Sequence, residues 1–228
     1  MSIILQKGPY LGRPKILFIG LVDSSHTQAW INLLAGGEFN VRLFAMPYGP
    51  SLDWPLKTDL SGTAFQQNST ALHYKFSFIY KVAVRNIGLL FPWLFSARLA
   101  NVIKQWKPDI IHTLGLFDGQ GGQFYFEARR KFHLESYGKW ILQLRGGSDM
   151  ELRRHNPEFR GLIQQALSEC EQIICDNRTN IKYAGELGIP PSKFASIVPV
   201  PGTGGIDLVS DDSDRMSLPS KRERIILW

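Results

Sequence analysis

The sequence KWILQLRGGSD, residues Lys139–Asp149, predicts a buried strand that ends in a glycine-rich turn. Trp140–Leu144 is a short, mostly apolar run, which is typical of a parallel strand covered by helices on both faces. The two glycines that follow allow backbone conformations closed to other residues and a close approach by a ligand. Ser148 and Asp149 then offer a hydroxyl, a carboxylate and a helix start signal. Because ligands of parallel sheets bind beyond the carboxyl ends of the strands, this segment is the first candidate for function, although a plain turn with a helix cap would have the same local sequence.

Apolar runs of this kind recur along the chain and alternate with segments of helical periodicity. This alternation predicts an α/β fold, a Rossmann-like, doubly wound and mainly parallel sheet of about seven strands. The expected strands are Lys15–Gly20, Asn40–Ala45, Ala71–Phe78, Asp109–Leu114, Trp140–Leu144, Gln172–Cys175 and Ala195–Val200. The expected helices are Gln28–Leu34, 81–106 with a break near Pro92, Gln123–Phe132, Glu158–Glu171 and Asn177–Leu187, and a long loop is expected at Met46–Thr70.

Changes in composition divide the chain into three parts. Residues 1–14 are expected to form an irregular arm, and residues 15–205 the Rossmann-like domain. Residues 206–228 begin with a charged, serine-rich stretch that is typical of a linker and end in the apolar run Arg224–Trp228. This last run resembles the first strand of a second domain, so we expect the natural chain to continue; the alternative is a strand that joins the edge of the first sheet.

Composition indicates a globular protein with a substantial core. Of the 228 residues 44% are hydrophobic, and no run approaches the roughly 20 apolar residues of a membrane span. The first residues lack the pattern of a signal peptide, so a cytoplasmic location is expected. Two cysteines, Cys170 and Cys175, are too few for a disulfide framework or a metal site.

Charge is distributed unevenly. The net charge is +6, and no acidic residue occurs between Asp59 and Asp109. Within this interval the basic residues from Lys75 to Lys107 are interleaved with aromatic ones, a combination that suits an anionic membrane surface or an anionic ligand. A solvated helix face above an ordinary core would have the same composition. Nucleic acid is not an expected partner, because no recognition motif accompanies the charge.

Polar loops follow several of the expected strands at their carboxyl ends. They offer hydroxyls, amides, carboxylates and histidines, which suit polyhydroxylated ligands or phosphates. No dinucleotide fingerprint, Walker motif or nucleophile elbow occurs. Each residue also has a structural interpretation: a core histidine for His112, a helix start for His26, caps for Asp149 and Asp176, and ion pairs for Arg145 and Arg178. The loops are Asp23–His26, His112–Thr113 with Gly115–Gly122, Arg145–Asp149 and Asp176–Arg178.

Four segments, in this order and spacing, make the chain similar to the N-terminal domain of GT-B glycosyltransferases, most of all the large retaining family 4. KILFIG with SSHTQAWINLLAGGEFNVRLF resembles the opening strand, loop, helix and second strand of that family. WKPDIIHTL resembles its "kPDiiH" strand, WILQLRGGSD its "tlHGsD" segment, and SIVPVPGTGGIDL its "vPnGvD" stretch. RERIILW then resembles the first strand of the second domain. Two departures stand out: Gly146 occupies the position of the family's common histidine, and the "PnG" turn is lengthened.

The resemblance implies an enzyme that transfers a sugar from a nucleotide-sugar donor, with retention and without a metal or other cofactor. It implies that this chain is the acceptor-side half and that most donor contacts belong to a C-terminal domain of the same chain, so residues 1–228 alone are expected to be inactive. No catalytic residue is assigned. Donor phosphates are expected near Gly20, Ser24 and Ser25. The unknown acceptor is expected near His26, His112, Arg145, Gly146, Gly147, Ser148, Asp149 and Asn177.

Two alternatives remain open from the sequence. The first is a non-catalytic binding domain that docks on anionic membranes through Lys75–Lys107. The second is another nucleotide-dependent enzyme on a doubly wound sheet, because one fold serves many activities.

Overall fold

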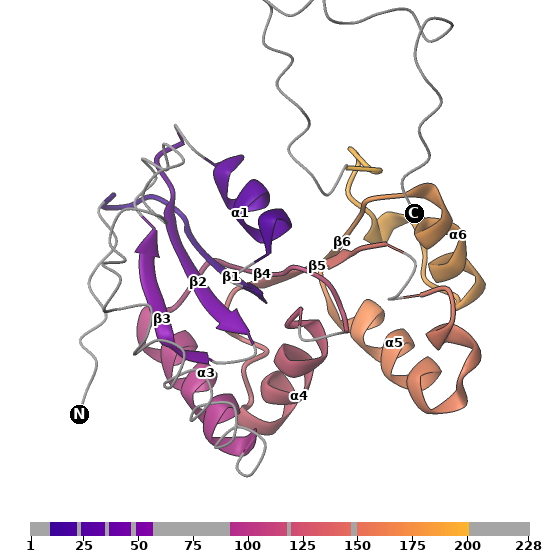
Figure 1. The fold of residues 1–228 in the computed structure, drawn as a ribbon, viewed down its shortest axis with the longest axis horizontal. Coiled ribbons are helices and arrows are strands. Elements are labelled where there is room, and N and C mark those ends of the chain that lie inside the picture. The colour runs from indigo at the N-terminus through magenta and orange to yellow at the C-terminus, as the bar shows by residue number, and fades with distance from the viewer. Residues whose placement is uncertain are drawn as a thin grey trace, which may run out of the picture.

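The computed structural model describes residues 10–21, 24–34, 37–46, 49–56, 92–117, 120–146 and 150–200. In these residues the chain forms an α/β fold with one six-stranded sheet flanked by helices (Figure 1). The strands are β1 (Lys15–Leu21), β2 (Asn40–Met46), β3 (Gly49–Leu56), β4 (Ile110–Thr113), β5 (Lys139–Leu144) and β6 (Gln172–Cys175). The helices are α1 (Ser25–Asn32), α3 (Pro92–Trp106), α4 (Gly122–Phe132), α5 (Pro157–Glu169) and α6 (Arg178–Glu186), with single 3-10 turns at Arg153–His155 and Pro191–Lys193.

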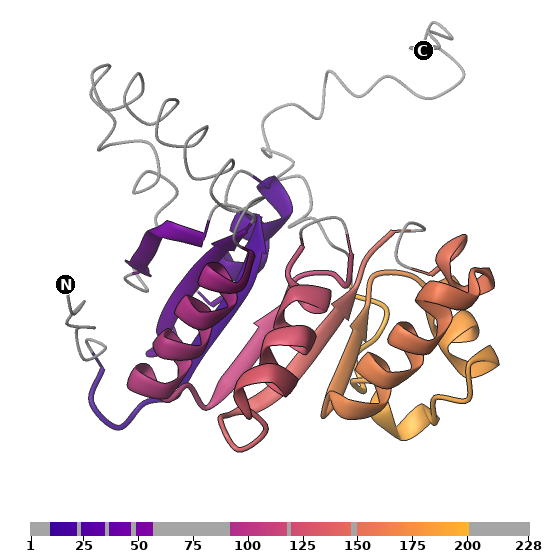
Figure 2. The same ribbon diagram turned by 90° about the horizontal axis from the view of Figure 1, so that it is seen from below.

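The strand order is β3-β2-β1-β4-β5-β6, and five of these strands are parallel. The strands β2 and β3 therefore lie on one side of β1 in the sheet, and the later strands β4, β5 and β6 lie on its other side. Helix α1 lies on one face of the sheet, whereas α3, α4 and α5 lie in a row on the opposite face (Figures 1 and 2). This arrangement confirms the doubly wound fold, and it places the topological switch point between β1 and β4.

A large core fills the space between the sheet and the α3–α5 layer. Trp140 of β5 is completely buried there, with Tyr125 at 5.2 Å and Phe126 at 6.3 Å between ring centroids. Its indole Nε1 donates a hydrogen bond to Thr113 Oγ1 at 3.1 Å, so the polar atom of this large side chain is satisfied. The apolar runs that predicted buried strands therefore supply the centre of the core.

A glycine allows the loop after β4 to pack directly against β1. Gly121 has φ +103°, and a Cβ at this position would lie 2.9 Å from the carbonyl oxygen of Ile19. Only glycine combines this backbone conformation with such a close approach. The first turn of α4 therefore lies against the carboxyl end of β1, at the edge of the sheet where the candidate site is found.

Two details of the expected sheet are corrected. The loop expected at Met46–Thr70 contains β3, which pairs antiparallel with β2; its two prolines disfavour a strand but are tolerated at a sheet edge. The strand expected at Ala195–Val200 is absent: the segment follows β6 with backbone bonds from Ala195 and Val200, but a turn and Pro199, which has no N–H, interrupt the ladder. The strand expected at Ala71–Phe78 and residues 206–228 lie outside the described residues.

We expect Trp140→Ala to lower the free energy of unfolding by about 3–5 kcal/mol, because it leaves a cavity in the centre of the core and an unpaired Thr113 hydroxyl. Urea unfolding at neutral pH measures this loss. Leu152→Ala is the control, because Leu152 is 79% exposed and its truncation should change stability by less than about 0.5 kcal/mol. Equal effects of the two substitutions would contradict this description of the core.

Candidate functional site

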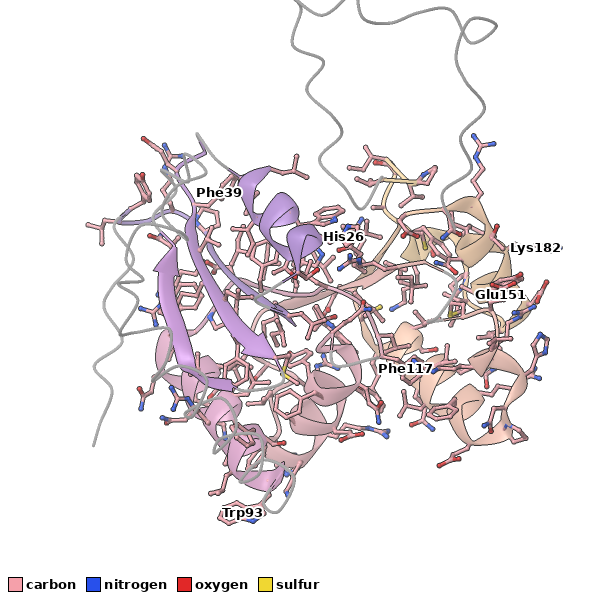
Figure 3. The ribbon with its side chains drawn as sticks, in the orientation of Figure 1. His26, Phe39, Trp93, Phe117, Glu151 and Lys182 are labelled. Carbon is pink, nitrogen blue, oxygen red and sulfur yellow. The ribbon has the colours of Figure 1, made fainter. Side chains whose placement is uncertain are left out.

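A cleft of about 460 Å³ opens at the carboxyl edge of the parallel strands. Its lining comes from the ends of four strands, β1, β4, β5 and β6, so that segments far apart in the sequence meet there. The crevice beyond the switch point is where ligands bind in open α/β sheets. Figure 3 labels His26, which belongs to the first turn of α1, near the centre of the view. The lining residues are Leu21, Ser24, His26, Gln120, Arg145, Gly146 and Asp176.

The turn after β5 is held by two hydrogen bonds, one to the backbone N–H and one to the carbonyl oxygen of Gly146. Gly146 has φ +56°, in the left-handed region that favours glycine. Its N–H donates to Asp176 Oδ2 at 2.8 Å, and its carbonyl oxygen accepts from Asn180 Nδ2 at 2.8 Å. Asn180 belongs to the first turn of α6 and is only 1% exposed, so it donates this hydrogen bond from a buried position. The β5 turn is therefore held against the β6–α6 loop.

The same loop also begins α6. Asn177 is the N-cap residue, and its Oδ1 accepts from the backbone N–H of Asn180 at 2.8 Å. Its Nδ2 donates to Asp176 Oδ1 at 2.7 Å. The cap is thus Asn177 and not Asp176, whose two carboxylate oxygens instead accept hydrogen bonds from Gly146 and Asn177. Asp176 therefore positions the turn, and it offers the cleft a carboxylate that is already hydrogen-bonded.

Arg145 adds a cation at the base of the cleft. Its Nη1 donates to the carbonyl oxygen of Leu114 at 3.4 Å, which directs the guanidinium across the end of β4. A guanidinium has several N–H donors in a rigid plane and binds carboxylates, phosphates and hydroxyls. With the Ser24 hydroxyl, the His26 imidazole and the Gln120 amide, the cleft offers hydrogen-bond donors and acceptors to a ligand rich in hydroxyl or anionic groups.

The structure brings together four of the site residues expected from the sequence, Ser24, His26, Arg145 and Gly146. Asn177 does not line the cleft, but it donates a hydrogen bond to Asp176, which does. Gly20 is at the end of β1, where a Cβ would lie 3.1 Å from the Leu114 side chain. Ser25 begins α1, and its side chain is outside the described part. Gly147, Ser148 and Asp149 are also outside the described residues.

His112 is placed elsewhere. It lies in β4 on the α1 face of the sheet, with its ring 5.1 Å from Phe18 and 5.5 Å from Trp30 between centroids. It is 5% exposed and does not line the cleft. Burial lowers its pKa from 6.5 to about 3, so the imidazole is neutral at physiological pH. The structure therefore gives His112 the position of a core histidine.

Four contributors to the site are absent from the expected site residues. Leu21, Gln120 and Asp176 line the cleft, and Asn180 holds Gly146 from the buried side of α6. Asp176 was expected only as part of a polar loop and as a possible helix cap. Gln120 lies within the glycine-rich loop at Gly115–Gly122, so its neighbourhood was recognised although the residue was not. Asn180 has one weak signal: a polar residue three positions after a capping Asn, on the face of a helix that should be apolar.

Comparisons with known proteins identify no family. No protein-family model matches the chain, and no curated protein matches it. Among solved structures, a crystal structure of UDP-N-acetylglucosamine 2-epimerase is 12% identical, with a TM-score of 0.43; the match covers 80% of this chain and 47% of the epimerase chain. The chain thus spans about half the length of that protein. The fold assignment rests on the strand order and helix layers described above.

The hydrogen bond from Gly146 to Asp176 can be tested directly. We expect Asp176→Ala to accelerate hydrogen exchange of the Gly146 amide by about tenfold or more, since one hydrogen bond to a charged group is worth roughly 1.5–3 kcal/mol. Exchange measured by NMR shows the change. Asp109→Ala is the matched control, because Asp109 Oδ2 accepts from the backbone N–H of Lys15 at 2.8 Å, away from the cleft. Equal acceleration by both variants would show general loosening instead of a local hold.

The buried His112 should make stability depend on pH. Between pH 6.5 and about 3 the unfolded chain binds a proton at this residue that the folded chain does not. The free energy of unfolding should therefore fall as the pH is lowered below 6.5, by up to about 1.4 kcal/mol per pH unit from this group.

Urea unfolding at pH 7.5 and pH 5 compares the chain with two variants. His112→Leu should reduce the loss of stability between the two pH values, whereas His155→Gln should not, because His155 is exposed. An undiminished loss in His112→Leu would mean that His112 accepts a proton in the folded state.

Proposed function

We propose that this domain is the acceptor-side half of a GT-B sugar transferase that uses a nucleotide-sugar donor and retains the configuration at the transferred carbon. The observation that carries the proposal is the cleft at the switch point, where Ser24, His26, Arg145 and Gly146 meet from separate strands. Three of the segments that resemble family 4 form β1, β4 and β5. Their resemblance and their common edge in the fold support the same conclusion.

The cleft has the chemistry that a sugar acceptor needs. A hydroxyl group both donates and accepts hydrogen bonds, and the Ser24 hydroxyl and the His26 imidazole can do the same in return. Arg145 supplies only donors, so it suits an acceptor oxygen that carries negative charge or several lone pairs. Holding the acceptor hydroxyl in place beside the donor sugar removes much of the entropic cost of bringing two substrates together.

Departure of the nucleoside diphosphate requires stabilisation of negative charge. The resemblance assigns most of this work to a second domain, so the described domain positions the acceptor and closes one side of the site. This division of roles explains why we expect no transfer by residues 1–228 alone. It also means that acceptor binding, and not turnover, is the property that this chain can reveal.

We expect methyl α-glucopyranoside, methyl α-mannopyranoside or their 6-phosphates to bind in the cleft with millimolar affinity. Titration of the isotope-labelled chain, followed by NMR, should shift the amides of Ser24, His26 and Gly146. Arg145→Ala should weaken binding by about tenfold, which corresponds to roughly 1.4 kcal/mol. Arg160→Ala is the matched control, because Arg160 is exposed on α5 and does not line the cleft.

Two results would contradict the proposal. One is the absence of any shift at the cleft with all four probes. The other is turnover of UDP-glucose, GDP-mannose or ADP-glucose by the 228-residue chain in a coupled assay for released nucleotide, because this chain would then contain both halves of the site.

A further inference from the structure

Helix α3 has an outer face that is apolar at one end and basic at the other. Its inner face is buried in the core through Leu99, Ile103 and Trp106. On the outer face Trp93 is 52% exposed and Leu94 is 40% exposed, in the first turn of the helix. Figure 3 shows Trp93 pointing outward from the lower side of the molecule. We define the outer face of α3 by its exposed residues, Trp93, Leu94, Asn101, Lys104 and Gln105, together with Lys107 just beyond the helix.

The stretch of sequence that contains α3 carries charge of one sign. The chain contains 26 Lys and Arg and 20 Asp and Glu. Residues 60–108 hold six of the basic residues and none of the acidic ones, so the rest of the chain has 20 of each. The whole excess of positive charge therefore lies in this interval, of which the structure describes α3 and the residues just after it. A surface that combines exposed Trp and Leu with exposed lysines complements an anionic lipid surface.

The direction of α3 relates this face to the cleft. The carboxyl end of α3 lies next to the start of β1, because Lys15 Nζ donates to the carbonyl oxygen of Trp106 at 3.2 Å. The amino end of the helix, with Trp93 and Leu94, therefore lies toward the carboxyl edge of the sheet, where the cleft opens. None of the helices in the described residues is long and apolar enough to cross a membrane.

We infer that the outer face of α3 docks the domain on an anionic lipid bilayer. Trp93 and Leu94 enter the interface between headgroups and acyl chains, since an indole ring prefers this depth. Lys104 and Lys107 remain at the level of the headgroups and are attracted by anionic lipids. The contact is peripheral and reversible, because a surface of this size supplies few apolar groups and few charges. Docking does not depend on the proposed transferase activity.

Co-sedimentation with vesicles tests the inference on the 228-residue chain. We expect binding to vesicles of phosphatidylcholine with 30% phosphatidylglycerol (roughly the anionic fraction that gives a substantial negative surface potential), and little binding to pure phosphatidylcholine. Added salt should weaken binding, because the attraction between exposed charges is screened. Absence of binding to the anionic vesicles, or equal binding to both kinds, would overturn the inference.

Substitutions then locate the contact. Trp93→Ala with Leu94→Ala should weaken binding by about tenfold or more, and Lys104→Gln with Lys107→Gln by a similar factor. Leu152→Ala is the control, since Leu152 is an exposed leucine next to the 3-10 turn before α5, and it should bind as the unaltered chain does. Unaltered binding by both double variants would show that another surface makes the contact.

Lipids with brominated acyl chains quench the fluorescence of tryptophans that enter the bilayer, so they can be used to measure the insertion of Trp93. The chain has six tryptophans, so the difference in quenching between the unaltered chain and Trp93→Phe isolates the contribution of Trp93. A decrease in quenching on substitution supports insertion, and no difference contradicts it. A parallel titration with a DNA duplex tests whether the lysines bind nucleic acid instead. If the chain binds the duplex and not the vesicles, and the lysine variants lose duplex binding, the inference of a lipid surface is wrong.

Discussion

The two hydrogen bonds at Gly146 connect the last two strands of the sheet at the point where the cleft forms. A peptide group in a turn has lost the partners that a strand would give it, and it must find others or remain in contact with water. Here the carboxylate of Asp176 and the amide of Asn180 take both polar groups of one residue. The position of Arg145, one residue earlier, follows from this constraint. If the turn were free, the guanidinium would have no fixed relation to the residues after β1.

The opposite wall of the cleft depends on a different constraint, which is steric. Parallel strands must all present their carboxyl ends at one edge, and the change of direction between β1 and β4 leaves a crevice there. After β4 the N–H of Gly122 donates to the carbonyl oxygen of Gly115 at 2.9 Å, which holds the start of α4 close to the end of that strand. Because Gly121 has no side chain, its backbone lies directly against Ile19 at the end of β1, and the neighbouring Gln120 lines the cleft. Hydrogen bonds therefore shape one wall, and the small size of glycine shapes the other.

Apolar runs and glycines were sufficient to predict the fold, because a strand buried on both faces has few sequences available to it. The same signals were not sufficient at the edges of the sheet. The two prolines of β3 are compatible with a strand only at an edge, and no local pattern shows that position. The segment after Phe194 has the apolar character of a strand, but its geometry depends on the irregular continuation of the ladder along β6.

The residues that line the cleft could be predicted only in part, for a related reason. His112 lies near the end of β4 and Arg145 directly follows the neighbouring β5, as the expected strands predicted. Which side chain reaches the cleft depends also on how far beyond the strand it lies, and on what covers the face to which it points. His112 lies within β4 and is covered by Trp30 of α1, whereas Arg145 is one residue past the end of β5. The contribution of Asn180 could be seen only once α6 had been placed beside the turn.

The direction of α3 has a consequence for the relation between the two proposed surfaces. In a parallel sheet each connecting helix runs opposite to the strand that follows it, so the first turn of α3 must lie toward the edge at which β4 ends. Trp93 and the cleft therefore lie toward the same edge of the domain. A lipid surface bound at this turn would lie beside the cleft and would favour an acceptor that is itself presented at that surface. The two surfaces were inferred from separate observations, and the topology of the sheet places them at the same edge of the domain.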